Sequence, residues 1–201
     1  MSKEEATIVS RSQVAQDAFV ICCLDGMRHG RFLDIGAGEP ELISNTVMLE
    51  RDFGWTGICC DIETEQRLRE QRGATVVGDF FAQDWGARCE SIAVDERIDY
   101  LSLDLEPPQL TLAALCELPL SKVRFSVITI EHDVYRGFDS IRTAMRAILL
   151  EHGYVRVASD VTINGLPFED WWIDPKVVDV DLATQAANDI NGATRADGAG
   201  I

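Results

Sequence analysis

The chain has 201 residues, of which 46% are hydrophobic and 26% are charged, a composition typical of a soluble globular domain and unlike that of a mostly disordered chain. Asp and Glu outnumber Lys and Arg by 34 to 18, which gives a formal net charge of −16. This balance argues against a nucleic-acid partner and against docking on an anionic membrane, since both require basic surface. The longest apolar runs are shorter than the roughly 20 residues that a bilayer-spanning helix needs.

The six cysteines and the N-terminus indicate a reducing compartment. The cysteines include no C-x-x-C pair and have no histidine partners at zinc spacing, so they are expected to be buried small hydrophobes. The charged residues 1–5 lack the apolar stretch and cleavage site of a secretory signal. We therefore expect a cytoplasmic protein.

Short apolar runs alternate with amphipathic segments along the chain. Apolar positions at helical spacing predict a first helix over 11–28. The next run, over 31–36, reads as a strand that ends in a glycine turn. Further helices are predicted over 40–53, 63–72, 108–118 and 139–151. Further strands are predicted over 57–61, 74–78, 98–104, 125–131, 154–159 and 169–173.

This alternation is typical of βαβ units and predicts an α/β fold, in which a mostly parallel central sheet of about seven strands is flanked by helices. In such sheets, ligands bind at the carboxyl ends of the strands, near the topological switch point. We expect residues 1–180 to form a single domain. Residues 181–201 are small and polar, and we expect a loosely ordered tail there.

The sharpest local motif is Asp34-Ile-Gly-Ala-Gly38, at the end of the first strand. Its two glycines, Gly36 and Gly38, would let the backbone approach a ligand closely and direct N–H groups at it. The pattern is D-x-G-x-G rather than G-x-G-x-x-G, which disfavours a dinucleotide and suits S-adenosylmethionine. The alternative is a tight turn between strand and helix with no ligand.

Acidic residues also follow the second and third strands. Asp61 stands where an acid hydrogen-bonds ribose hydroxyls in nucleoside-binding α/β folds, although it could equally cap the helix that follows. Asp79 could accept a hydrogen bond from an adenine amino group, and Phe80 could stack on the ring. The alternative for this pair is an ordinary turn.

A second polar group follows the fourth and fifth strands, whose carboxyl ends should meet at one edge of the sheet. Carboxylates and an imidazole there could bind a divalent cation or act as general bases. The alternative is that these side chains simply face water. The residues are Asp104, Glu106, Glu131, His132 and Asp133.

Two adjacent tryptophans, Trp171 and Trp172, follow the acids Glu169 and Asp170 near the end of the predicted domain. One is expected in the core. The other could line a substrate pocket, or pack on an edge strand.

With these residues in view, the chain resembles the FkbM family of S-adenosylmethionine-dependent methyltransferases. The resemblance covers about residues 30–175 and implies a Rossmann-like class I methyltransferase fold. It implies methyl transfer to a hydroxyl, often on a sugar or glycoside. The matching stretches are FLDIGAGEPELISNTVMLERDFGWTGICCDIE (32–63), IDYLSLDLE (98–106), VITIEHDVYRG (127–137) and, more weakly, FEDWWIDP (168–175).

The resemblance assigns cofactor contacts to Asp34, Gly36, Gly38 and Asp61, with Asn45 and Asp79 as further candidates. Related metal-dependent sugar O-methyltransferases suggest that Mg²⁺ or another divalent cation is held by Asp104, Glu131 and either His132 or Asp133. The candidate catalytic residues are His132, Asp133 and Glu106. The expected substrate is a small hydroxylated acceptor. A homo-oligomer is compatible with the sequence.

The chain departs from the family where D-x-E-G-x-E is usual, because it has Pro107 in place of the glycine and Gln109 in place of the last acid. Proline fixes φ and removes an N–H, and glutamine cannot act as a base. Asp174 replaces a histidine that often precedes proline. These departures favour an alternative function, a catalytically silent S-adenosylmethionine-binding module in an assembly. A nicotinamide-dependent oxidoreductase is a third reading, which the glycine spacing disfavours.

Overall fold

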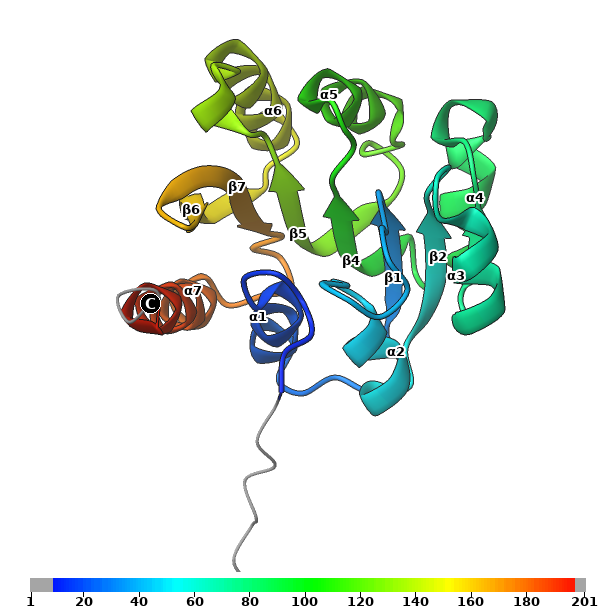
Figure 1. Cartoon of the computed structure of the whole chain (residues 1–201), viewed down its shortest axis with the longest axis horizontal. Helices are drawn as coiled ribbons and strands as arrows, with labels where there is room; N and C mark the ends of the chain where they lie inside the picture. Colours follow the sequence, from blue (N-terminus) through cyan, green and yellow to red (C-terminus); the bar gives the residue numbers. More distant parts are fainter. Residues whose placement is uncertain (1–8, 198–201) are drawn as a thin grey trace, which may run out of the picture.

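The computed structural model describes residues 9–197 and contains a seven-stranded sheet flanked by helices on both faces (Figure 1). The strand order is β3-β2-β1-β4-β5-β7-β6, with β7 antiparallel to both of its neighbours and the other pairs parallel. The chain order reverses between β1 and β4, so the topological switch point lies there.

The strands are β1 (Arg31–Ile35), β2 (Thr56–Cys60), β3 (Thr75–Val77), β4 (Arg97–Leu103), β5 (Arg124–Glu131), β6 (Val155–Ile163) and β7 (Leu166–Ile173). The α-helices are α1 (Gln16–Cys23), α2 (Val47–Phe53), α3 (Glu65–Gln71), α4 (Trp85–Ile92), α5 (Pro108–Glu117), α6 (Asp139–Glu151) and α7 (Val180–Asp197). Two short 3₁₀ helices are η1 (Phe80–Ala82) and η2 (Val134–Arg136).

Side chains that alternate along the strands form two hydrophobic cores, one on each face of the sheet. One core joins the sheet to α1, α2, α3 and α7, and the other joins it to α4, α5 and α6. Trp171 and Trp172 illustrate the alternation, because each is fully buried in a different core. Trp171 stacks on Phe19 of α1, with ring centroids 4.4 Å apart. Neither tryptophan therefore lines a pocket, and β7 is an inner strand, with β6 at the edge of the sheet.

The predicted helix over 40–53 begins only at Val47, because the residues before it form bends and turns. These residues are held by side-chain bonds instead. Ser44 Oγ accepts hydrogen bonds from the backbone of Val47 and from the guanidinium of Arg72. Pro40 therefore lies outside the helix that it was expected to start.

The expectation of a loosely ordered tail over 181–201 is wrong for residues 181–197, which belong to helix α7. Ala183 and Ala187, one turn apart, are fully buried in the core shared with α1 and the sheet. Alanine has high helix propensity, and its small side chain lets two helices approach closely. Residues 198–201 of the predicted tail lie outside the described residues. Within residues 9–197, no helix is both long and apolar enough to cross a membrane.

Candidate functional site

A cavity of about 570 Å³ opens at the carboxyl ends of β1, β2, β3 and β4. Its lining combines the glycine turn after β1, the acids after β2 and β3, and the segment between β4 and α5. Since these elements flank the switch point of the sheet, the cavity lies where α/β folds of this type bind their ligands. The predicted residues in its lining are Gly36, Gly38, Asp61, Asp79, Phe80, Asp104 and Glu106.

Gly36 allows the ends of β1 and β4 to touch. Its φ is +79°, and a Cβ at this position would lie 1.5 Å from the backbone oxygen of Asp104. Any other residue would force the two strand ends apart. Gly38 also has a positive φ, +60°, but a Cβ there would meet nothing within 4 Å, so its cavity side is open. The turn thus presents bare backbone to the cavity.

Asp61 holds the glycine turn in place and caps the segment that leads into α3. Its Oδ2 accepts a hydrogen bond from the Gly38 N–H at 3.0 Å, and its Oδ1 accepts from Glu63 and Thr64 at 2.9 and 2.8 Å. Capping and ligand contact are compatible, because a carboxylate has about four acceptor sites. Asp79 similarly uses Oδ1 to accept from the Phe81 N–H at 2.9 Å.

Asp34 and Asn45 were expected to contact the cofactor, but neither is part of the cavity lining. Asp34 is 1% exposed and accepts a hydrogen bond from the Thr46 hydroxyl at 2.5 Å. Burial raises the pKa of the Asp34 carboxyl, against the lowering effect of the Thr46 bond. Arg72 donates to the same hydroxyl at 2.9 Å, and the amide of Asn45 donates to Ser102 at 3.0 Å. These residues anchor the segment before α2 from outside the cavity lining.

Phe81, the neighbour of Phe80, offers an exposed ring to the cavity, whereas the ring of Phe80 is buried. Phe80 is 3% exposed and stacks on Trp85, with centroids 4.6 Å apart, so its ring belongs to the core. Phe81 is half-exposed and lines the cavity, as do the exposed Ile43 and Ile62. Sequence reasoning missed these three. The available signal was an apolar residue, Ile62, directly after a strand-end acid.

Four carboxyl groups gather where β4 and β5 end. Asp104 and Glu131 are hydrogen-bonded to each other, which requires a proton on one of them, and Glu131 is also bonded to Asp133. Burial raises the pKa of Asp104 to about 6. Burial and then the charge of Asp104 raise the pKa of Glu131 well above its ordinary value. Glu106 and Asp133 instead pair with Arg136. The cluster can both hold and accept a proton near neutral pH.

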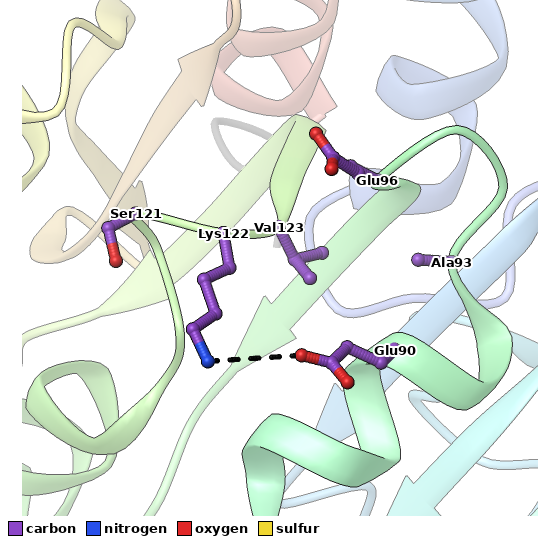
Figure 2. Close-up of a pocket in the computed structure, with 6 residues that line it drawn as sticks. All are labelled: Glu90, Ala93, Glu96, Ser121, Lys122 and Val123. Carbon is purple, nitrogen blue, oxygen red and sulfur yellow. Dashed lines mark ion pairs between the residues drawn. The ribbon is translucent and has the colours of Figure 1, made fainter.

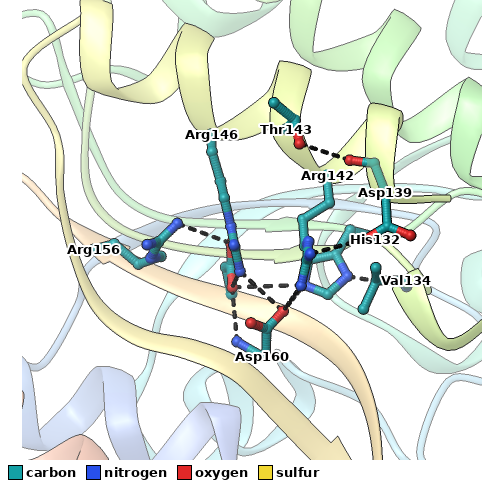
Figure 3. A network of polar contacts seen from close by, with 9 residues as sticks. His132, Val134, Asp139, Arg142, Thr143, Arg146, Arg156 and Asp160 are labelled. Carbon is teal, nitrogen blue, oxygen red and sulfur yellow. Dashed lines mark hydrogen bonds and ion pairs between the residues drawn. The ribbon is translucent and has the colours of Figure 1, made fainter.

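His132 does not join this cluster, so the structure separates it from the predicted metal partners Asp104 and Glu131. It is 1% exposed, and its Nε2 lies 3.5 Å from carboxylate oxygens of both Asp160 and Asp170 (Figure 3). Its Nδ1 accepts a hydrogen bond from the Val134 N–H at 3.2 Å. Arg146 pairs with both acids, at 2.9 and 2.6 Å. His132 is therefore part of a buried polar network that joins β5, β6, β7 and α6.

The donor atoms of the carboxyl cluster decide whether a divalent cation fits there. Glu106, Glu131 and Asp133 offer oxygens that lie within 4.8 Å of one another, the ligand chemistry that Mg²⁺ prefers. However, Nη1 of Arg136 already lies 2.7 and 2.9 Å from the oxygens of Glu106 and 2.7 Å from Asp133 Oδ2. With the guanidinium in place, this donor set does not fit a metal ion. Glu131 lies beside Asp104 but outside the cavity lining, and the predicted partner His132 contacts Asp160 and Asp170 instead.

A second cavity, of about 500 Å³, lies at the opposite edge of the sheet, where β4 and β5 begin. Figure 2 shows Lys122 pointing across it toward Glu90, and the two form an ion pair at 4.0 Å. Both side chains are more than half exposed. This cavity contains none of the predicted site residues and lies at the edge that α/β folds of this type do not use for ligands.

Comparison with known proteins bears on the fold. No family model matches the sequence, and no curated protein matches it. Among solved structures, the chain is similar to a protein of the NADB-Rossmann superfamily from Streptococcus agalactiae, with 14% identity and a TM-score of 0.53 over 85% of this chain and 71% of that one. It is also similar to a candidate O-methyltransferase from Klebsiella pneumoniae, with 15% identity and a TM-score of 0.51 over 84% of this chain and 82% of that one. At these identities the two likenesses show the fold, which is of the Rossmann type, and the FkbM resemblance stays a prediction.

Proposed function

We propose that the chain is an S-adenosylmethionine-dependent methyltransferase that acts on a hydroxyl of a small molecule. The observation that carries the proposal is the cavity itself, in which bare glycine backbone, the strand-end acids and apolar side chains adjoin a proton-sharing carboxyl pair. The sequence resemblance supports a sugar or a glycoside as the acceptor. The acidic residues that line the cavity also support such an acceptor, because carboxylates accept hydrogen bonds from several hydroxyls at once.

S-adenosylmethionine would be held by Gly36, Gly38, Asp61 and Asp79, and when bound it supplies a methyl group on a sulfonium centre. Gly38 leaves room for close approach of the ligand to the backbone, while Gly36 shapes the turn by packing on the backbone of Asp104. The carboxylate of Asp61, already fixed by three backbone N–H groups, is oriented to accept from ribose hydroxyls without further loss of entropy. Ile62 and Phe81 offer exposed apolar surface for a flat ring.

Methyl transfer joins an acceptor oxygen to carbon as the bond from carbon to sulfur breaks, and the hydroxyl must lose its proton. The ionised member of the Asp104 and Glu131 pair can take that proton. Its raised pKa makes it a stronger base than an ordinary carboxylate. Burial is the main cause of both raised pKa values, and the neighbouring Asp133, which pairs with Arg136, adds to them. The remaining contribution is positioning, which in-line displacement rewards strongly.

Calorimetric titration with S-adenosylmethionine and S-adenosylhomocysteine tests the cofactor assignment. We expect micromolar binding, and about tenfold weaker binding for Ile62→Ala, since losing an apolar contact costs about 1–2 kcal/mol. Val94→Ala is the matched control, because Val94 is 56% exposed and is not part of the cavity lining. No binding by the wild-type chain would refute the proposal.

Turnover tests the assigned base. With hydroxylated acceptors screened for S-adenosylhomocysteine release, Asp104→Asn should lose turnover by about a hundredfold or more and keep its cofactor affinity, because Asp104 has the lower pKa of the pair and is its ionised member. Unchanged turnover would exclude Asp104 as the base. The departures at Pro107 and Gln109 favour a second candidate, a silent binding module. That function would show cofactor binding without turnover for every acceptor class tried.

A further inference from the structure

Arg136 lies between Glu106, which lines the cavity, and Asp133, which is buried outside the cavity lining. Its side chain extends from η2 to Glu106, in the segment after β4, and to Asp133, directly after β5. We infer that Arg136 is the resident cation of this carboxylate cluster and takes the place of a divalent metal ion. The inference rests on the proposed function only in placing this carboxylate cluster on the side of the cavity that would bind the acceptor.

The steric argument concerns a single atom. Nη1 of Arg136 contacts three carboxylate oxygens, two of Glu106 at 2.7 and 2.9 Å and one of Asp133 at 2.7 Å. Mg²⁺ binds oxygen at about 2.0–2.1 Å, so an ion shared by these same oxygens would occupy the volume of Nη1. Metal binding would therefore require the loss of all three hydrogen bonds, which are charge-assisted.

The charge of the cluster is already compensated from within. Arg136 neutralises part of the charge of Glu106 and Asp133. The hydrogen bonds that Arg136 donates to Asp133 and Glu106 also raise its own pKa, so its charge is permanent. A protein cation thus does what a bound ion would do for these acids.

The same contacts make Arg136 a positioning residue. By pairing with both Glu106 and Asp133, it joins the segments that follow β4 and β5. Arg136 acts on the reaction through these carboxyls and needs no contact with the reacting atoms.

Titration with Mn²⁺ alone, followed by calorimetry and by the electron paramagnetic resonance signal of free Mn²⁺, tests the inference. We expect weak binding by the wild-type chain and at least about tenfold tighter binding by Arg136→Gln, which frees three oxygens and removes one positive charge. Arg136→Lys keeps the charge and should bind Mn²⁺ as weakly as wild type. Arg51→Gln is the control, since it removes an equal charge from the exposed ion pair with Glu41.

Two results would overturn the inference. One is wild-type Mn²⁺ binding as tight as that of Arg136→Gln, and the other is no gain in Arg136→Gln while its circular dichroism stays native. The wild-type titration alone can refute the inference if the glutamine variant does not fold. Failure of the proposed function is separate, because a chain that ignores S-adenosylmethionine can still gain Mn²⁺ binding when Arg136 is replaced.

Discussion

Replacing Glu169 with glutamine should remove a pH dependence of folding stability that this buried carboxyl creates. Glu169 lies on β7 opposite Glu131 of β5 and is 3% exposed. It accepts hydrogen bonds from the Trp171 indole at 2.5 Å and from the Gln16 amide at 3.3 Å. Within residues 9–197, no ion pair reaches it, and burial raises its pKa from 4.5 to about 8.

The magnitude follows from the two pKa values. Because the folded value is the higher one, the folded chain keeps a proton that the unfolded chain releases between pH 4.5 and about 8. The stability from this group is complete below pH 4.5 and is lost as the pH rises through about 8. At about 1.4 kcal/mol per pH unit, the whole loss is about 5 kcal/mol. The part lost between pH 6 and pH 8 is about 2 kcal/mol.

Urea unfolding at pH 6, 7 and 8 measures this loss as a slope. The free energy of unfolding should fall about 2 kcal/mol more for wild type than for Glu169→Gln over this range. The slope is the test because the glutamine amide also meets the Gln16 amide, which shifts the absolute stability at every pH. Glu117→Gln, at an exposed position on α5, should keep the wild-type slope. Parallel curves for wild type and Glu169→Gln would refute the reasoning.

Three further substitutions test other parts of the structure. Arg146→Met leaves the 2%-exposed carboxylate of Asp170 without its bidentate partner and should lower the free energy of unfolding in urea by about 3 kcal/mol. The double variant Arg146→Met/Asp170→Asn should recover part of this stability, and no recovery would contradict a buried-charge penalty. Gly36→Ala places a Cβ 1.5 Å from the backbone oxygen of Asp104 and should lower the melting temperature and abolish S-adenosylmethionine binding; an unchanged melting temperature would contradict the contact. Arg72→Met removes the buried anchor of the segment before α2 and should weaken the same binding about tenfold in calorimetry, whereas unchanged affinity would show that this segment needs no anchor.

Much of the sheet could be predicted from the sequence, because each parallel strand is a short apolar run and both of its faces are buried. Run length and flanking turns therefore placed β1, β2, β4 and β5 within a residue or two. The helix expected from Pro40 failed for a tertiary reason, since the segment before α2 bonds to Arg72 from a distant part of the chain. Helix α7 was missed because its fully buried residues are the small Ala183 and Ala187, whose burial depends on how closely α1 approaches.

The candidate site shows the same division. The positions of Gly36, Asp61 and Asp104 follow from strand ends, which parallel pairing brings to one edge. The direction of a side chain just past a strand does not follow, because one residue of difference reverses the face. His132, next to Glu131, thus points toward Asp160 of β6 and Asp170 of β7 and away from the acidic cluster. The contact of Arg136 with Glu106 spans 30 residues and has no local signal in the sequence.

Residue 104 contacts Gly36 through its backbone, whereas its side chain takes part in the carboxyl cluster. Gly36 meets only main-chain atoms of Asp104, so the junction of the two strands does not depend on which side chain residue 104 carries. The side chain of the same residue belongs to the carboxyl cluster. Substitutions of residue 104 can therefore change the chemistry of the cluster while the glycine turn keeps its shape. Under the proposed function, a lineage built on this junction could change acceptors by replacing residue 104 and its neighbours, with the cofactor side of the cavity inherited unchanged.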